Sequence, residues 1–228
     1  MALSSDNLKE LINHPDRKER ECSEYIELIG EFLIPQYSDK DITYIKKEYI
    51  GNKGRVDYIL ITKIEEGGDT NNRAYFWELK APQCNIFIND ESSDERLGPS
   101  PDLIDAENQL LYYYYEHKHN DGFIREYELG GPDNVCLGGI IISSEEKKVY
   151  ERIAEKDKER LYGVAFRIRT KILYDEKIRL MTWDDIHKVL CSLEEGAKPI
   201  EPTDVQLTEI PIPTIPDNAK YRIEEEVT

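Results

Sequence analysis

Apolar residues recur along this chain with two different periods, which predict helices in some segments and strands in others. Near the N-terminus, a helix is expected over 6–13, with Ser5 as its N-terminal cap. A second helix is expected over 16–34 and is closed by Pro35. Its apolar residues follow helical spacing: Tyr25, Ile26, Ile29, Phe32 and Leu33.

Runs rich in β-branched and aromatic residues predict strands over 43–50, 54–61 and 74–82. The polar segment 63–72 separates the last two runs and contains Gly, Asn and Asp residues, which are typical of turns. We therefore expect these two runs to form an antiparallel hairpin.

The rest of the chain predicts helices that alternate with single strands. The stretch 83–99 has no clear period and is long for a loop in a compact domain. Ser100-Pro101-Asp102 is typical of a helix start, and Ser143 with Glu146 fits a capping box. The further elements are a strand over 136–142, a helix over 156–174, a strand over 179–183 and a helix over 184–193.

The length of 228 residues suits one domain, which we assign to 1–193, followed by an acidic, proline-rich tail over 194–228. The sequence shows neither a signal peptide nor an apolar run near the ~20 residues that span a bilayer, so no membrane partner is expected. Four cysteines are scattered without paired spacing, which fits a reduced cytoplasm.

The net charge of -17 argues against a nucleic-acid partner, because DNA binding normally rests on Lys and Arg contacts to phosphate. The charge is uneven, however. The segment 145–179 holds eleven basic and eight acidic residues, whereas the tail 194–228 holds three basic and nine acidic residues. Part of the acidity therefore lies outside the expected core.

Asp57 stands inside the first apolar run of the hairpin, and Glu78 and Lys80 stand inside the second. Because side chains alternate along a strand, Glu78 and Lys80 point to one face while Trp77 and Leu79 point to the other. A charge in such a run is costly to bury unless it is paired. The spacing fits either a salt bridge on an edge strand or a divalent-cation site.

Mg²⁺ prefers oxygen ligands and keeps several waters, so Asp57, Glu78 and the backbone carbonyl of Leu79 would suit it, with Mn²⁺ as a substitute. Such a cation polarises a phosphoryl oxygen and activates a water. Lys80 would orient that water or stabilise developing charge. These groups supply the main parts needed to hydrolyse a phosphodiester.

Asp57 with Glu78-Leu79-Lys80 resembles the motif of the PD-(D/E)xK nuclease superfamily. The order of the motifs over roughly 23–193 is similar to that in the nuclease domain of Shedu anti-phage defence proteins. The segments that carry this resemblance are Val56 to Leu60, Glu78 to Pro82, Arg96, Asp102 to Leu110, Gly139 to Ile142 and Leu180 to Ile186.

The resemblance implies a restriction-endonuclease-like α/β fold, in which helices flank a mixed central sheet. It also implies a homo-oligomer that cleaves DNA with Mg²⁺ in bacterial defence against phage. It places Glu27, from the second helix, in the metal site, although Glu24 and Glu31 lie on nearly the same helix face. Arg96 is placed at the nucleic acid and Gln109 at the water or a phosphate, although Gln109 also fits a surface amide.

Arg167 and Lys171 share a face of the expected helix 156–174, where they would either meet phosphate or remain solvated. The run Tyr112–Tyr115 suits base stacking, although core packing fits it better. Two other functions stay open. In one, a nuclease-like fold serves as a non-catalytic interaction module whose acidic surface binds a protein. In the other, the enzyme cuts RNA or branched DNA.

Overall fold

The computed structural model describes residues 3–34, 42–51, 54–66, 69–150 and 155–196. Apart from its first three residues, the predicted tail 194–228 lies outside these ranges. Among the described helices, none is long and apolar enough to cross a membrane.

A mixed five-stranded sheet in the order β1-β2-β3-β6-β7 forms the centre of the fold. The pairs β1–β2 and β2–β3 are antiparallel, whereas β6 runs parallel to both β3 and β7. This arrangement confirms the predicted mixed α/β fold and the predicted hairpin. The strands are β1 (Ile42–Gly51), β2 (Gly54–Glu66), β3 (Asp69–Leu79), β6 (Val135–Ile141) and β7 (Arg179–Met181).

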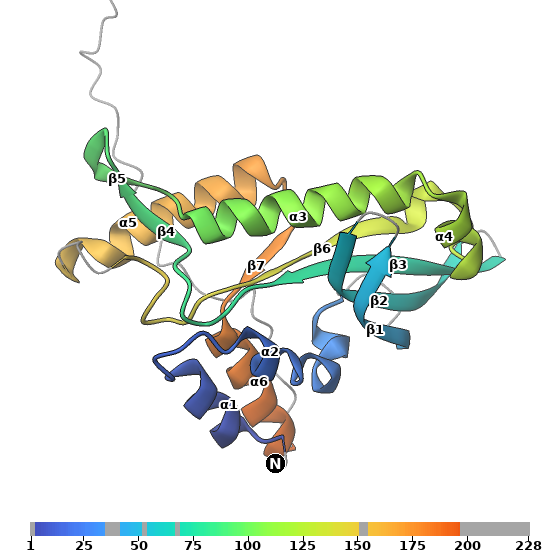
Figure 1. Cartoon of the computed structure of the whole chain (residues 1–228), viewed down its shortest axis with the longest axis horizontal. Helices are drawn as coiled ribbons and strands as arrows, with labels where there is room; N and C mark the ends of the chain where they lie inside the picture. The colour runs from blue at the N-terminus through green and yellow to red at the C-terminus, as the bar shows by residue number, and fades with distance from the viewer. Residues whose placement is uncertain (1–2, 35–41, 52–53, 67–68, 151–154, 197–228) are drawn as a thin grey trace, which may run out of the picture.

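Helices cover both faces of this sheet (Figure 1). The long helix α3 and the helix α5 lie on one side, and α1, α2 and α6 lie on the other. The α-helices are α1 (Ser5–Ile12), α2 (Glu19–Ser23), α3 (Pro101–Lys118), α4 (Asp121–Glu126), α5 (Glu155–Arg167) and α6 (Trp183–Glu194). The π-helix η4 (Ile168–Leu173) continues α5, and three short 3₁₀ turns are η1 (Ile26–Leu28), η2 (Gly30–Phe32) and η3 (Pro132–Asn134).

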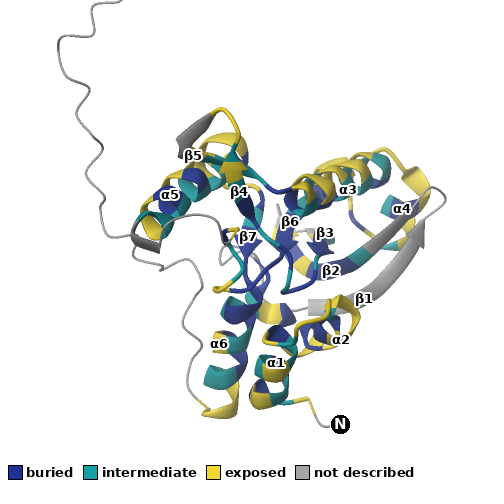
Figure 2. Cartoon of the chain, turned by 60° about the vertical axis from the view of Figure 1, so that its left-hand side comes forward, coloured by how far each residue is buried: buried dark blue, intermediate teal, exposed yellow. Residues whose placement is uncertain are grey.

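Alternation along β2 and β3 divides the apolar interior into two clusters, one on each face of the sheet. Ile59 and Phe76 face α3 and pack with its Leu110. Tyr58 and Trp77 face the opposite way and pack with residues of α1 and α6. Figure 2 shows buried residues concentrated where the helices meet the sheet. Each large apolar side chain buried in this way contributes about 1.5–3 kcal/mol.

The Trp77 indole fixes the contact between β3 and β6, because it lies directly against two glycines. A Cβ atom on Gly138 would lie 2.3 Å from Nε1 of Trp77, and one on Gly139 would lie 2.4 Å from the carbonyl oxygen of Arg179. Both distances are far shorter than any van der Waals contact. Only glycine therefore fits at these positions, and the end of β3 is held firmly in place.

The expected helix over 16–34 is wrong as a continuous element, because α2 ends at Ser23 and the 3₁₀ turns η1 and η2 follow. A 3₁₀ turn has three residues per turn, so Ile26, Ile29 and Phe32 share a side in this geometry as well. Ile26 and Ile29 are fully buried. The apolar spacing thus predicted burial correctly but did not distinguish the two kinds of helix.

Two loop predictions also differ from the structure. The irregular stretch 83–99 contains a small antiparallel hairpin of β4 (Phe87–Asp90) and β5 (Ser93–Pro99). The predicted turn 63–72 is shorter than expected, because β2 and β3 continue to pair as far as Glu66 and Asp69. The charged and polar residues on these strands obscured the period of two.

Two predicted caps are wrong. Ser143 begins no helix: its backbone has a φ of 70°, and its hydroxyl donates to the carbonyl of Ser144. The cap of α1 is Ser4, whose hydroxyl accepts the N–H of Asn7 at 3.3 Å, rather than Ser5. The expected start of α3 is confirmed, because Ser100 caps this helix. Helix α6 begins at Trp183, one residue before the expected start, because Thr182 forms a capping box with Asp185.

Candidate active site

Asp57 and Glu78 lie on neighbouring strands at the end of the β2–β3 pairing. Tyr58 pairs with Trp77, and the next residue toward the same end of the sheet is Asp57 on β2 and Glu78 on β3. The backbone N–H of Leu79 donates to Oδ2 of Asp57 at 2.9 Å, which ties the two strands together. The sequence-predicted pair of carboxylates is therefore present on the α3 face of the sheet.

Lys80 extends from the end of β3 toward the same face. Its Nζ donates to Oε1 of Glu78 at 3.1 Å and to Oε1 of Gln109 at 3.1 Å. Its backbone is held on both sides, because its N–H donates to Ile141 and its carbonyl accepts the indole N–H of Trp183 at 2.7 Å. The side chain therefore projects from a fixed point.

Helix α3 brings Gln109 and a further residue, Asp105, to Lys80. These two residues are one helical turn apart, so they lie on the same face of α3. Oδ2 of Asp105 lies 2.9 Å from Nζ of Lys80 and accepts Nε2 of Gln109 at 2.7 Å. Gln109 therefore lies beside Lys80, and its contact with water or phosphate stays a prediction, whereas no pattern in the sequence singled out Asp105.

Burial dominates the electrostatics of Glu78, which is 2 % exposed. Burial, and after it the nearby charge of Asp57, raises the pKa of Glu78 to about 9, although Lys80 opposes both effects. A buried carboxyl group beside a second carboxylate favours its neutral form. A cation bound between the two would relieve this repulsion.

The pKa of Lys80 is raised even though burial by itself would lower it, because the hydrogen bonds that its ammonium donates to Asp105 and Glu78 stabilise the charged form. The pKa of Asp105 is lowered, chiefly by its hydrogen bond to Lys80. Asp105 and Lys80 are therefore a charged pair, with the Lys80 side chain 13 % exposed and that of Asp105 58 % exposed.

Glu19, at the start of α2, is an acidic residue near this site that the sequence did not indicate. Although the residue as a whole is exposed, partial burial of its carboxyl group raises its pKa, and the nearby charge of Asp57 adds to the shift. Lys80 and the backbone N–H of Ala81 oppose the shift. Glu27 lies on η1 and is exposed, and it is not among the main groups that shift the pKa of Glu78.

The oxygen donors at this site fit a hard divalent cation such as Mg²⁺. Within the described ranges, no group of three or more His, Cys, Asp or Glu side chains is placed to hold a metal ion. The choice of Asp57, Glu78 and the main-chain carbonyl of Leu79 as protein ligands stays a prediction from the sequence. A site with two carboxylates and remaining positions for water is usual for Mg²⁺.

The other predicted residues lie elsewhere and pair locally. Arg96, on β5, contacts Asp90 at 3.2 Å and Ser92 at 2.9 Å within the small hairpin. Nε of Arg167 donates to the carbonyl of Gly163. Lys171, on η4, pairs with Glu176 at 2.6 Å on the exposed surface. In the tyrosine run, Tyr113 and Tyr114 pack against the core, whereas Tyr112 and Tyr115 are exposed.

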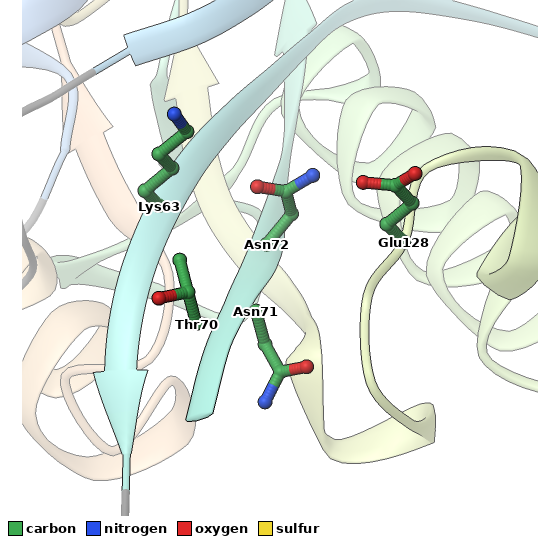
Figure 3. Close-up of a pocket in the computed structure, with 5 residues that line it drawn as sticks. All are labelled: Lys63, Thr70, Asn71, Asn72 and Glu128. Carbon is green, nitrogen blue, oxygen red and sulfur yellow. The ribbon is translucent and has the colours of Figure 1, made fainter. Parts of the chain in front are cut away.

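A polar pocket lies toward the opposite end of the β2–β3 hairpin (Figure 3). It is lined by Lys63, Thr70, Asn71, Asn72 and Glu128. The pair Lys63↔Asn72 lies five residues along the strand from Tyr58↔Trp77, or about 17 Å at the usual strand rise. The pocket is therefore separate from the cluster around Asp57 and Glu78.

The comparison with known families agrees with this geometry. The family model described as Shedu protein SduA, C-terminal, matches residues 16–186, and the chain belongs to this family. It is a nuclease domain of anti-phage defence. The match spans Glu19, Asp57, Glu78, Lys80 and Gln109. A search among curated proteins gave no match.

Proposed function

We propose that this domain hydrolyses phosphodiester bonds in DNA with Mg²⁺, for which Mn²⁺ can substitute. The observation that carries the proposal is the convergence of Asp57, Glu78 and Lys80 at one end of β2 and β3. Membership of the Shedu family supports it independently.

The bound cation would supply Lewis-acid chemistry at a phosphate oxygen and at a water. Asp57 and Glu78 would bind it through their carboxylates and Leu79 through its carbonyl. The Lys80 ammonium would stabilise the negative charge that develops on the phosphate. Gln109, which already accepts a hydrogen bond from Lys80, would help to orient that ammonium.

The DNA would approach a chain whose net charge is -17, so local basic segments would govern the encounter. Arg167 and Lys171, close together where α5 passes into η4, are the candidates for phosphate contact. Arg96 on β5 is a third candidate. Lys171 is held by an exposed ion pair, which is weak and readily exchanged for phosphate.

We further propose that the active unit is a homo-oligomer. Val164, Ile168 and Ile172 follow each other at intervals of four residues, and they are 41 %, 47 % and 71 % exposed. Such an exposed apolar stripe is typical of a protein contact. A second copy would bring two basic segments close together. Light scattering over a concentration series tests this, and a strictly monomeric chain with full nuclease activity would contradict it.

The function is tested by incubating the purified full chain with supercoiled plasmid, linear duplex, single-stranded DNA and RNA. Each substrate is combined with Mg²⁺, Mn²⁺ or EDTA. We expect DNA cleavage with either cation and none with EDTA, and no cleavage by Asp57→Ala. Cleavage of RNA alone would reassign the substrate.

One observation favours a second function. Lys80 is already engaged by Glu78, Asp105 and Gln109, and the surface is strongly acidic. A non-catalytic module that binds a protein partner would also tolerate this arrangement. Lack of cleavage of every substrate, together with lack of Mn²⁺ binding, would favour that module over the enzyme.

A further inference from the structure

Three partners surround the ammonium group of Lys80, and they belong to two different elements. Glu78 is on the same strand, at 3.1 Å, and Asp105 and Gln109 come from α3, at 2.9 Å and 3.1 Å. An ammonium group has three N–H donors, so these contacts can use its full hydrogen-bonding capacity. The position of Lys80 is thus fixed jointly by β3 and α3.

The two carboxylate partners of Lys80 differ in what else they can do. Glu78 is buried beside Asp57 and is a candidate cation ligand. Asp105 is largely exposed and contacts Lys80 and Gln109. A cation that takes an oxygen of Glu78 weakens the contact between Glu78 and Lys80. Asp105 then remains as the charged partner of Lys80.

Helix α3 is well suited to hold Asp105 in place. Leu103, Ala106 and Leu110 are buried in the core against the sheet. On another side of the helix, Glu107 accepts Nε of Arg169 at 2.6 Å and also the hydroxyl of Tyr174. The helix is therefore fixed both to the sheet and to η4, and Asp105 sits on a rigid support.

We propose that Asp105 is a positioning residue that holds the Lys80 ammonium in place when a divalent cation occupies Asp57 and Glu78. This inference rests on the proposed nuclease function for its importance to catalysis, but the contact itself can be tested without any cleavage. Asp105 acts through Lys80 and touches neither the cation nor the DNA.

The test measures how fast an acylating reagent modifies Lys80 in the full chain, by mass spectrometry of the digested protein. In Asp105→Ala with Mn²⁺, we expect modification roughly tenfold faster than in the wild type with Mn²⁺, the scale of one charged hydrogen bond. Equal rates in these two samples would overturn the proposal. Asp105→Asn serves as a second variant of nearly identical shape if the alanine variant unfolds.

A metal-free arm separates this result from the question of cation binding. Glu78→Gln in EDTA replaces the carboxyl group of Glu78, so that residue 78 cannot be a charged partner of Lys80, and no metal is needed. In EDTA, the double variant that carries both Asp105→Ala and Glu78→Gln should be acylated at Lys80 faster than Glu78→Gln alone, by a factor similar to that expected with Mn²⁺. If the wild type cuts no nucleic acid, the nuclease proposal fails, yet this arm still decides whether Asp105 positions Lys80.

Lys148 provides a matched control within the same molecule. Its side chain is also 13 % exposed, and it pairs with Glu145 at 2.8 Å and with Glu159 at 3.1 Å. Glu159→Ala should speed modification of Lys148 and leave Lys80 and DNA turnover unchanged. In the active enzyme, Asp105→Ala should lower kcat without raising the KM for DNA. A raised KM with an unchanged kcat would contradict a positioning role.

Discussion

Oε1 of Glu78 accepts a hydrogen bond from Nζ of Lys80 at 3.1 Å, and the two residues share a face at the end of β3. Glu78 is a buried acid whose pKa is raised, and Lys80 is a charged base whose position is also held by α3. In the proposed enzyme, the carboxylate of Glu78 would bind a cation in place of its hydrogen bond with Lys80.

Replacing Lys80 should separate catalysis from folding. We expect Lys80→Ala to keep the fold and Mn²⁺ binding but to slow DNA cleavage by roughly 10²–10⁴-fold, the scale for one positioned charge or proton-transfer group. Single-turnover kinetics with plasmid DNA measures this. An unchanged rate would assign Lys80 to a structural salt bridge.

The buried carboxyl group of Glu78 should make the metal-free protein less stable as pH rises. Its pKa is raised to about 9 by burial and by Asp57, whereas an unfolded chain has the ordinary value near 4.5. Between these values the native state holds a proton that the unfolded state has released, so the free energy of unfolding falls with increasing pH. Its favourable contribution is complete below the unfolded value and is gone by pH about 9.

Thermal unfolding in EDTA across this pH range tests that expectation. Glu78→Gln cannot titrate, so its Tm should fall less steeply with pH than that of the wild type. Parallel curves for the two proteins would show that Glu78 has an ordinary pKa in the folded state.

Glu19 and Glu27 can be compared directly, because the family resemblance pointed to Glu27 and the structure places Glu19 near the cluster. Glu19→Gln should weaken Mn²⁺ binding several-fold, since an exposed ion pair typically contributes up to about 1 kcal/mol. Glu27→Gln is the matched control and should bind Mn²⁺ like the wild type. Weaker Mn²⁺ binding by Glu27→Gln and unchanged binding by Glu19→Gln would instead support Glu27.

Neutralising Arg167 and Lys171 should weaken DNA binding without changing the cation site. If both side chains touch phosphate, the slope of log K against log salt should decrease by about one unit for each side chain neutralised. Fluorescence anisotropy in EDTA, at several salt concentrations, measures the slope. Lys177→Gln, which removes an exposed lysine paired with Asp175, is the control. An unchanged slope in the double variant would place the DNA elsewhere.

The part of the site that lies on the hairpin could be predicted from the sequence, because strand alternation is a local property. It placed Glu78 and Lys80 on one face and Trp77 on the other, as the two core clusters show. Glu19 could not be predicted in this way. The apolar spacing over 16–34 fits both an α-helix and 3₁₀ turns. It therefore does not reveal the break after Ser23, which separates Glu19 on α2 from Glu27 on η1.

The place of Asp105 at the site could not be predicted from the sequence either, because it depends on tertiary packing. Its distance from Lys80 is set by how Leu103 and Leu110 seat α3 on the sheet, which no spacing within the helix specifies. The β4–β5 hairpin was missed for a different reason. Charged residues such as Asp90 and Arg96 interrupt the alternation, so the segment resembled a loop.

Whether Asp57 and Glu78 form a cation site is the central question, and calorimetric titration with Mn²⁺ tests it most directly. The wild-type chain should bind Mn²⁺ with a measurable heat, and Asp57→Ala should show none while its Tm in EDTA remains close to that of the wild type. Equal Mn²⁺ binding by Asp57→Ala, or none by the folded wild type, would contradict a metal-dependent nuclease built on these two carboxylates.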